Sequence, residues 1–320
     1  IIVGNEIEFA IKNVALIKKN DSVNNYYMKY FLGSNATITK MRVEAKGSTQ
    51  KFVSLGYLRS FEIPLPPLKT QARIVSILDS AFADIERARA NAEKNLKNAR
   101  ELFDSYLNKV FTEGGDGWEH KKILDLSTKL GDGLHGTPKY TNNGEYHFIN
   151  GNNLSDGYIV IKEKTKSVSK EEYYKHKKNL NDRTILVSIN GTLGNVAFYR
   201  DEKVILGKSA CYFNLKADVN KDFVKFVIQS PVFQSYAMKE ATGATIKNVS
   251  LKSMRNFKLP VPSLRQQTEL VDLFKSINRQ TKQLVTTYEN KLKSLDELKQ
   301  SLLQKAFSGE LTKEDEGIAA

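Results

Sequence analysis

Two stretches of this chain are repeated further along it, and they decide its fold. Gly47-Ser-Thr-Gln-Lys-Phe-Val-Ser-Leu55 matches Gly243-Ala-Thr-Ile-Lys-Asn-Val-Ser-Leu251, and Phe61-Glu-Ile-Pro-Leu-Pro-Pro-Leu68 matches Phe257-Lys-Leu-Pro-Val-Pro-Ser-Leu264. Each pair is separated by the same 196 residues, as from position 47 to position 243, and this offset also pairs Gln71 with Gln267. A fixed internal offset indicates a repeated structural module. The chain therefore contains two copies of one module.

The first copy is shorter than the second. The second copy is expected to begin near Gly117-Trp118, whereas residue 1 of the chain corresponds to residue 197. Residues 118–196 consequently have no counterpart in the first copy.

Each copy is predicted to end in a long helix. Apolar residues recur in steps of mostly three and four from about Gln71 to Phe111, and again from Leu270 to Ala306. This spacing is typical of a coiled-coil seam. About 40 residues give a helix of roughly 60 Å. The two helices are expected to pair antiparallel, because a parallel pair would crowd the two globular parts together.

The junction before each helix has its own pattern. Pro64-Leu-Pro-Pro67 and Pro260-Val-Pro262 are expected to hold the chain extended, since proline and the residue before it disfavour helix. Ser263 and Gln266 then form a predicted capping box.

The globular part of the second copy mixes predicted strands and helices. Apolar runs predict strands, and a helical segment with a break near Pro231 covers about residues 223–238. The predicted strands span residues 184–189, 196–199, 203–206 and 210–213. The expected fold class is α+β, with two globular domains separated by an antiparallel pair of long coiled-coil helices. The expected segments are 1–70, 71–116, 117–265 and 266–320.

Positive charge is confined to the globular segments. The chain has 49 Lys and Arg against 36 Asp and Glu, a net charge of +13. Residues 118–265 hold 24 of these cations and 14 of the anions, and residues 1–70 hold 10 and 5. Residues 71–117 hold 7 and 8, and residues 266–320 hold 8 and 9. The globular parts should therefore face an anion, of which nucleic acid is the commonest.

Polar loops in the second copy could supply sequence-specific contacts, because base edges are read by hydrogen-bonding side chains. These residue types also make ordinary turns, which is the alternative for any single position. The candidate DNA contacts in the second copy are Thr137, Lys139, Tyr140, Asn150, Asn152, Asn153, Ser188, Asn190, Thr192, Lys208, Ser209, Thr242, Thr245, Lys247 and Asn248. Those in the first copy are Lys12, Ser48, Thr49 and Lys51.

The single cysteine, Cys211, lies in an apolar run and is expected to be a core residue. One cysteine allows no internal disulfide, which fits a reducing cytoplasm. No apolar run approaches the roughly 20 residues that cross a bilayer.

The chain resembles the specificity subunits of Type I restriction-modification enzymes. The resemblance rests on the repeat and on Pro260-Val-Pro-Ser-Leu-Arg-Gln-Gln267 with its counterpart at 64–71. It also rests on Gly117-Trp118-Glu119, Thr242-Gly-Ala-Thr245 and Gln304-Lys-Ala-Phe-Ser-Gly-Glu-Leu311. The chain departs from that family in lacking the front half of the first target-recognition domain.

The resemblance implies a non-catalytic subunit that binds double-stranded DNA. Each target-recognition domain would read one half of a bipartite site, and the helices would fix the gap between the halves. Two methyltransferase subunits and the restriction subunits would be its partners. S-adenosylmethionine would bind to the methyltransferase, and ATP and Mg²⁺ to the motor-nuclease.

Other classes of protein make different demands on the sequence. An adenine methyltransferase would need an Asn-Pro-Pro-Tyr or Asp-Pro-Pro-Tyr motif, and Pro66-Pro67 is the one double proline in the chain. A coiled-coil adaptor and a free-standing DNA-binding regulator stay open on the residues alone. Apolar helix residues should be partly exposed if they dock a partner, and buried if they finish the packing of helix on domain. The candidates for partner binding are Phe82, Phe103, Leu107, Leu273 and Phe307.

Overall fold

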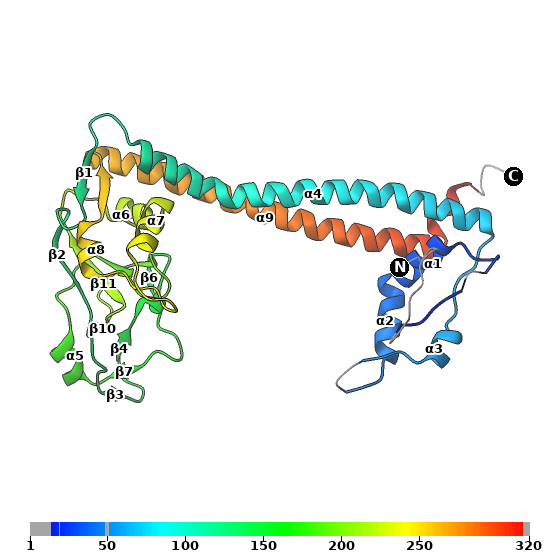
Figure 1. Ribbon diagram of the computed structural model, residues 1–320, viewed down its shortest axis with the longest axis horizontal. Helices are drawn as coiled ribbons and strands as arrows, with labels where there is room; N and C mark the ends of the chain where they lie inside the picture. Colours follow the sequence, from blue (N-terminus) through cyan, green and yellow to red (C-terminus); the bar gives the residue numbers. More distant parts are fainter. Residues whose placement is uncertain (1–13, 19, 49–50, 316–320) are drawn as a thin grey trace. The chain divides into compact units, whose positions relative to one another are not determined.

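The structure is a computed structural model that describes residues 14–18, 20–48 and 51–315 (Figure 1). It divides into two compact units. Unit 1 comprises residues 1–97 and 284–320, and unit 2 comprises residues 98–283. Two long helices, α4 (Leu68–Glu113) and α9 (Leu264–Ser308), each contribute to both units. None of the described helices is long and apolar enough to cross a membrane.

A four-stranded sheet forms the centre of unit 2, with strand order β2-β11-β8-β9. Its two central strands are buried along their whole length, which explains their continuous apolar sequence. All its neighbouring strands are antiparallel. The strands are β2 (Ser127–Asp132), β8 (Thr184–Ser188), β9 (Val196–Phe198) and β11 (Ala210–Leu215).

A second four-stranded sheet covers one face of the first. Leu186 and Tyr212 of the central sheet pack against Ile149 and Leu206 of this second sheet in one apolar cluster. The strand order is β10-β4-β7-β3. Its strands are β3 (Tyr140–Thr141), β4 (Tyr146–Ile149), β7 (Ser167–Val168) and β10 (Val204–Leu206). The short elements beside the sheets are η1 (Gly151–Asn153), β5 (Leu154–Ser155), β6 (Tyr158–Ile159) and α5 (Lys170–His176).

Helices cover the other face of the central sheet. Ile185, Val187 and Phe213 point into a core that Phe223 of α6 and Phe233 of α7 also enter. These helices are α6 (Lys221–Gln229), α7 (Pro231–Glu240) and α8 (Leu251–Asn256). Strands β1 (Glu119–Lys122) and β12 (Lys258–Val261) pair antiparallel beside them. Unit 2 is thus an α+β domain, and the predicted strands and the helix break at Pro231 are confirmed.

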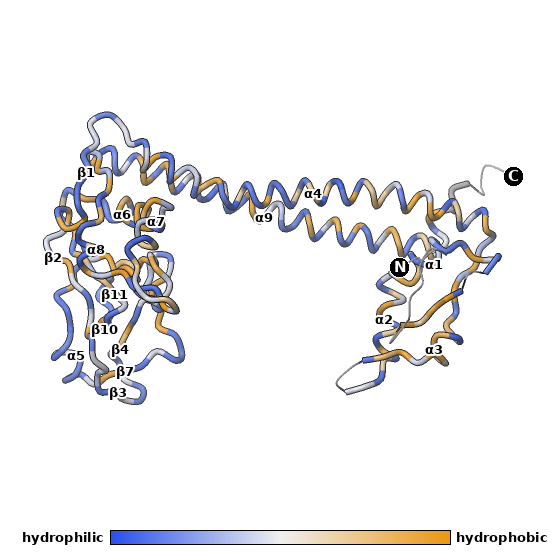
Figure 2. The backbone as a smooth tube through the Cα atoms, viewed as in Figure 1, coloured by the Kyte–Doolittle hydropathy of each residue, from blue (hydrophilic) through white to orange (hydrophobic). Residues whose placement is uncertain are grey.

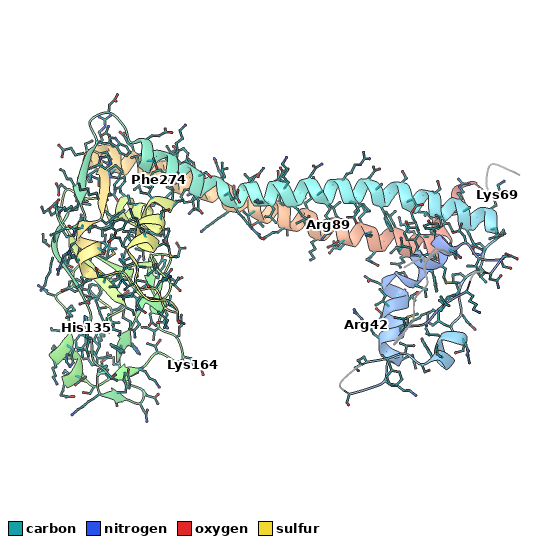
Figure 3. All side chains as sticks on the ribbon, viewed as in Figure 1. Arg42, Lys69, Arg89, His135, Lys164 and Phe274 are labelled. Atoms are coloured by element: carbon teal, nitrogen blue, oxygen red, sulfur yellow. The ribbon has the colours of Figure 1, made fainter. Side chains whose placement is uncertain are left out.

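The long helices run antiparallel, as expected. In unit 1, Arg89, which is labelled in Figure 3, contacts Asp296 at 2.5 Å. Glu86, one turn earlier on α4, contacts Lys299 at 2.9 Å. Apolar and polar residues alternate along both helices (Figure 2). Exposed ion pairs contribute little to stability, so the buried apolar residues between the helices provide most of it.

The predicted capping box begins α9. The Ser263 backbone N–H donates to Gln266 Oε1 at 3.1 Å, and the Gln266 N–H donates to Ser263 Oγ at 3.4 Å. These bonds satisfy donors that the first turn of a helix leaves free.

In unit 1 the short helix α1 packs on the two long helices. Tyr27 of α1 is buried with Ile74 and Leu78 of α4 and Leu303 of α9. The short helices are α1 (Asn25–Leu32), α2 (Asn35–Glu44) and α3 (Leu55–Arg59). A short 3-10 segment, η2 (Glu310–Asp315), follows α9.

The structure confirms the repeat in detail. Helices α1, α2 and α3 correspond at the 196-residue offset to α6, α7 and α8. An isolated antiparallel bridge joins Lys46 to Phe52 in unit 1, and the corresponding bridge joins Thr242 to Asn248 in unit 2. The two modules thus share their local contacts as well as their sequence.

Each unit is completed by the end of a helix that began in the other unit. Phe111, at the end of α4, stacks edge-on against Phe223 with ring centroids 5.7 Å apart. Phe307, the counterpart of Phe111 at the end of α9, stacks edge-on against Tyr27, the counterpart of Phe223, at 5.3 Å.

Unit 1 differs from unit 2 at the segment that corresponds to β11. Val14, Leu16 and Ile17 are 64%, 58% and 57% exposed, whereas their counterparts Ala210, Tyr212 and Phe213 are buried in β11. In unit 2, β2 and β8 flank β11 and help to bury it. Among the described residues, the corresponding segment of unit 1 is exposed and forms no strand.

Candidate nucleic-acid interface

Four of the predicted loops of unit 2 meet at one end of the central sheet. We call residues 150–153, 188–192, 207–209 and 242–248 the loop cluster. Because Ser188 ends β8 opposite Ala210, the first residue of β11, the loops beside these residues must lie together. The Ile189 N–H donates to the Ser209 carbonyl at 3.0 Å, and the Gly191 N–H donates to the Lys247 carbonyl at 2.9 Å. The sequence predicted these loops as separate segments, and the register of β8 and β11 brings them together.

The segment 242–248 is the most exposed part of the loop cluster. Thr242 and Asn248 exchange two backbone hydrogen bonds of 2.9 Å, which close a tight turn. Gly243 has a φ of 93°, and a Cβ there would lie 2.3 Å from the Ile246 carbonyl oxygen. The turn therefore needs glycine, and it presents the exposed Thr245 beside the half-buried Lys247.

The loop at 150–153 is held by side chains. Ser209 Oγ accepts from the Gly151 N–H and donates to Asn150 Oδ1, both at 2.9 Å. A Cβ on Gly151 would lie 2.2 Å from Ser188 Oγ, so glycine permits the close approach of this loop to β8. Asn150 and Ser209 thus hold the loop cluster in shape, and the exposed Asn152 is left to face solvent.

Two of the candidate DNA contacts have side chains that are inaccessible. Asn153 is 5% exposed, and its Nδ2 donates to the Val160 carbonyl at 2.9 Å. Ser188 is 1% exposed, and its hydroxyl donates to the Thr192 carbonyl. We therefore correct the sequence-based assignment: these two side chains support loops and are not available to a base edge.

Another two of the candidates bind each other. Asn190 Nδ2 donates to Asn248 Oδ1 at 3.1 Å, and both residues are half-buried. This bond joins the loop after β8 to the turn at 242–248. The candidates that the structure leaves exposed in unit 2 are Thr137, Lys139, Tyr140, Asn152, Thr192, Lys208, Thr242 and Thr245.

The loop at 133–140 starts beside the loop cluster and then leaves it. The Leu134 N–H donates to the Leu206 carbonyl at 2.6 Å, next to the loop at 207–209. At its other end the Lys139 N–H donates to Glu172 Oε1 at 3.1 Å. Sequence reasoning did not identify Glu172, although its place in the first turn of α5, capped by Ser169, is a helix-start signal. The buried Glu172 anchors the segment that carries Thr137, Lys139 and Tyr140.

His135 in this loop contacts Asp132 at 2.7 Å through its Nε2. The His135 side chain is 72% exposed. Its label in Figure 3 marks where this loop lies in unit 2. In the described part of the chain, no group of three or more His, Cys, Asp or Glu could hold a metal ion.

Unit 1 offers a smaller surface of the same kind. Ser48 and Lys51 are exposed on the turn at 46–52, which corresponds to the turn at 242–248. The candidates Lys12 and Thr49 lie outside the described residues.

The five candidate partner-binding residues differ in how far they are buried. Leu107 and Phe82 are 1% and 9% exposed, each inside the core of its own unit. Phe103 and Phe307 are half-buried and pack against the same cores. Leu273 alone of the five is exposed, at 44%. We therefore correct the assignment for Leu107 and Phe82, which finish the packing of helix on domain, and it stays a prediction for Phe103, Phe307 and Leu273.

The glutamines of the helix junctions have a role that their sequence motif did not reveal. Gln267 Oε1 accepts from the Asn220 N–H at 2.8 Å, and its Nε2 donates to the Pro262 carbonyl at 2.9 Å. Gln71 makes the corresponding bonds to Asn24 and Pro66, both at 2.8 Å. Both glutamines are 1% exposed. Each one ties a globular domain to the first turn of its long helix.

Comparison with known proteins agrees with this architecture. The Type I restriction modification DNA specificity domain matches residues 4–94 and 115–294. The chain is 25% identical over 336 residues to the Type I restriction enzyme EcoBI specificity subunit of Escherichia coli, covering 95% of this chain and 70% of that protein. It is 24% identical to the StySPI specificity subunit of Salmonella potsdam, covering 89% of this chain and 65% of that protein. The chain thus spans about two thirds of the length of these relatives.

A solved structure shares the fold. The crystal structure of the HsdS subunit from Thermoanaerobacter tengcongensis superposes with a TM-score of 0.60 at 18% identity, covering 91% of this chain and 71% of that one. A chain from a structural study of complex assembly in the type I R-M system superposes with a TM-score of 0.63. Since the specificity domain matches well over half of the residues, in two copies, this chain belongs to the Type I restriction modification DNA specificity domain family.

Proposed function

We propose that this chain is the sequence-specific DNA-recognition subunit of a Type I restriction-modification complex. The observation that carries the proposal is the loop cluster. A unit with an excess of lysine and arginine holds polar loops together at one end of a buried, rigid sheet. Lysine and arginine would neutralise phosphates, and the exposed hydroxyl and amide groups would read base edges in the grooves. Family membership favours this function over a coiled-coil adaptor.

Each target-recognition domain would read one half of a bipartite site. Unit 2 would supply its loop cluster, and unit 1 would supply the turn at 46–52. The long helices would set the number of base pairs between the halves. The chain itself would catalyse no reaction.

The chemistry would belong to partner subunits. We propose that two methyltransferase subunits dock on the chain and that restriction subunits join this core. S-adenosylmethionine would bind to the methyltransferase, and ATP and Mg²⁺ to the restriction subunits. The complex would act on DNA in the cytoplasm.

The test is to map methylated adenines by long-read sequencing in cells that contain the partner methyltransferase, with and without this gene. We expect methylation of a bipartite motif only when the gene is present. A third strain should carry Lys208→Ala, Thr245→Ala and Lys247→Ala together, which we expect to reduce or change that methylation. Lys164→Ala, Lys239→Ala and Ser276→Ala together, at three exposed positions outside the loop cluster, are the matched control.

Identical methylation with and without the gene would contradict the proposal. In that case, co-purification of the chain with the methyltransferase would show whether the two assemble without methylating DNA.

A further inference from the structure

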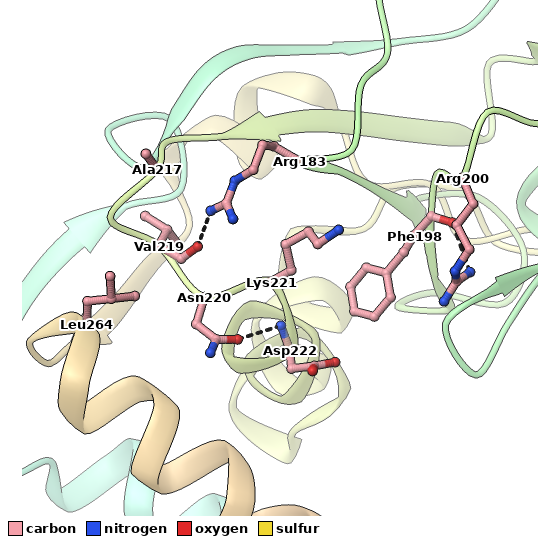
Figure 4. Close-up of a pocket in the computed structure, with 9 residues that line it drawn as sticks. All are labelled: Arg183, Phe198, Arg200, Ala217, Val219, Asn220, Lys221, Asp222 and Leu264. Carbon is pink, nitrogen blue, oxygen red and sulfur yellow. Dashed lines mark hydrogen bonds between the residues drawn. The ribbon is translucent and has the colours of Figure 1, made fainter.

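A basic pocket lies in unit 2 outside the loop cluster (Figure 4). Its volume is about 500 Å³, and it opens where β8 begins, β9 ends and α6 starts. We call it the basic pocket. It is lined by Arg183, Phe198, Arg200, Ala217, Val219, Asn220, Lys221, Asp222 and Leu264.

Three cations line the basic pocket, and among the described residues none of them forms an ion pair with a carboxylate. Arg183 Nη2 donates to the Lys216 carbonyl at 2.7 Å, and Arg200 Nη1 donates to the Gly157 carbonyl at 2.8 Å. Lys221 Nζ donates to the Asp182 carbonyl. Among the described residues, none of the three has a carboxylate oxygen within 4.0 Å. All three cations are thus held by backbone carbonyls, which leave their charge in place.

The single carboxylate of the basic pocket is already engaged. Asp222 Oδ2 lies 2.6 Å from Lys275 Nζ. Arg183 Nε is buried and has no hydrogen-bond partner. A donor buried without a partner is costly, so Arg183 adds an unsatisfied positive group to the wall of the basic pocket.

The electrostatics of Lys221 agree with this geometry. Burial is the largest cause that lowers the pKa of the Lys221 ammonium, and the nearby Arg183 and Arg200 lower it further, whereas Asp182 and Asp222 oppose this shift. The net effect disfavours the charged form, so a bound anion would reduce the repulsion among the three cations.

The basic pocket and the loop cluster lie at opposite ends of strand β8. Arg183 directly precedes β8, whereas Ser188, at the other end of the same strand, leads into the loop cluster. Five residues of strand place these ends about 17 Å apart. A group bound in the basic pocket would therefore lie several base pairs from a base held at the loop cluster.

The basic pocket is also specific to unit 2. The counterparts of Lys221 and Asp222 in the first module are Asn25 and Tyr26, and that of Arg200 is Gly4. A protein partner that docks in the same way on both modules would not bind at a pocket whose charged residues are present in one module alone. This favours a ligand of unit 2 alone.

We propose that the basic pocket binds a phosphate group, with Arg200 and Lys221 as its charged donors. The source that the charge of unit 2 favours is the DNA backbone beside the bases that the loop cluster reads, and this source rests on the proposed function. A free phosphate compound has the same chemistry and is the alternative source.

The test for DNA uses the full chain with Arg200→Gln and Lys221→Gln combined. Arg183 is kept because it holds two backbone carbonyls. We expect the slope of log affinity against log salt to become shallower by about one to two, equally for target and non-target duplexes. The matched control combines Lys164→Gln and Lys239→Gln, two exposed lysines outside the basic pocket. Lys164 is labelled in Figure 3. An equal change of slope in this control would count against the pocket as the DNA contact.

The test for a free compound measures the thermal midpoint of wild type and of both double variants with inorganic phosphate and pyrophosphate. Stabilisation of the wild type and the control, but not of the pocket variant, would support the phosphate site with a free source. No effect of the pocket variant in either assay would overturn the proposal. If the wild type binds no duplex at all, the proposed function fails, and the pyrophosphate assay alone decides the pocket.

Discussion

Gln267 and Gln71 show what one side chain contributes to the fold. Each closes the junction between a domain and its helix with a bond to a helix-capping asparagine and a bond to a proline carbonyl. Gln267→Ala would leave two buried backbone groups without partners. Because each such group costs about 1–3 kcal/mol, we expect the free energy of unfolding to fall by about 2–4 kcal/mol.

Urea denaturation of the variant measures this loss. Gln280→Ala, at an exposed position of the same helix, should change stability by no more than about 0.5 kcal/mol. Equal effects of the two substitutions would refute the tethering role of Gln267.

Thr245 and Lys247 separate two kinds of DNA contact within one turn. Thr245→Ala should cost about 1–3 kcal/mol on the target duplex and nothing on unrelated duplexes, because a base contact is lost. Lys247→Ala should weaken both alike and make the salt slope shallower by about one, because a phosphate contact is lost. Binding titrations on the two duplexes at several salt concentrations measure both effects. If Thr245→Ala weakened both duplexes equally, Thr245 would not read a base.

Cys211 illustrates a reactive residue type held in a structural position. It is fully buried in β11, and burial raises the pKa of its thiol above the usual 9.0. The thiolate is the reactive form, so we expect no reaction with thiol reagents at neutral pH until the chain unfolds. The native state binds this proton more tightly than the unfolded chain. Its contribution to stability is therefore full below pH 9 and is lost as the pH rises further. Labelling kinetics with and without denaturant measure this, and fast labelling of the native chain would contradict it.

At the scale of elements, the turn at 242–248 depends on its backbone conformation. Gly243→Ala places a Cβ 2.3 Å from the Ile246 oxygen at a φ of 93°. We expect a loss of about 1–3 kcal/mol in stability together with weaker binding of target DNA. Gly136→Ala is the matched control, since a Cβ there meets nothing within 4 Å. Calorimetry and duplex titration of both variants test this, and unchanged binding by Gly243→Ala would remove the turn from the interface.

Sequence patterns predicted some elements much better than others. Strands β8, β10 and β11 were predictable because they are buried apolar runs, and the long helices because their seams repeat over many turns. Strands β3 and β7 have two residues each and pair with partners distant in the sequence. Such short strands have no periodicity of their own, so only β10 of the second sheet was predicted.

The interface was predictable as a set of loops, but not residue by residue. Asn153 and Ser188 belong to the residue types that read bases, and yet both are consumed by local hydrogen bonds. Which polar side chain turns inward depends on the strand register and on close approaches such as that of Gly151, and these are tertiary features. The basic pocket was not predicted from the sequence, because Arg183, Arg200 and Lys221 are distant in the sequence and come together only in the folded domain.

At the scale of the whole molecule, the proposed spacing role of the helices gives a quantitative expectation. Deleting residues 94–100 and 281–287 would remove one heptad from each helix and keep both seams in phase. Seven residues correspond to about 10 Å, or about three base pairs of duplex. We expect the gap in the methylated motif to shorten by about that number. Deletion from α4 alone should break the pairing and serves as the folding control, and an unchanged gap with the double deletion would refute the spacing role.

The edge-on stacking of Phe111 on Phe223, and of Phe307 on Tyr27, has a consequence for how the gene can evolve by recombination. Each module donates the aromatic residue that completes the other, and it does so from the same position of the repeat. A recombination event within the repeated segment could exchange one module for that of a related gene and still deliver a chain whose two halves fit. Such an exchange would replace half of the recognised DNA sequence in one step. No intermediate gene would have to encode a chain that fails to fold.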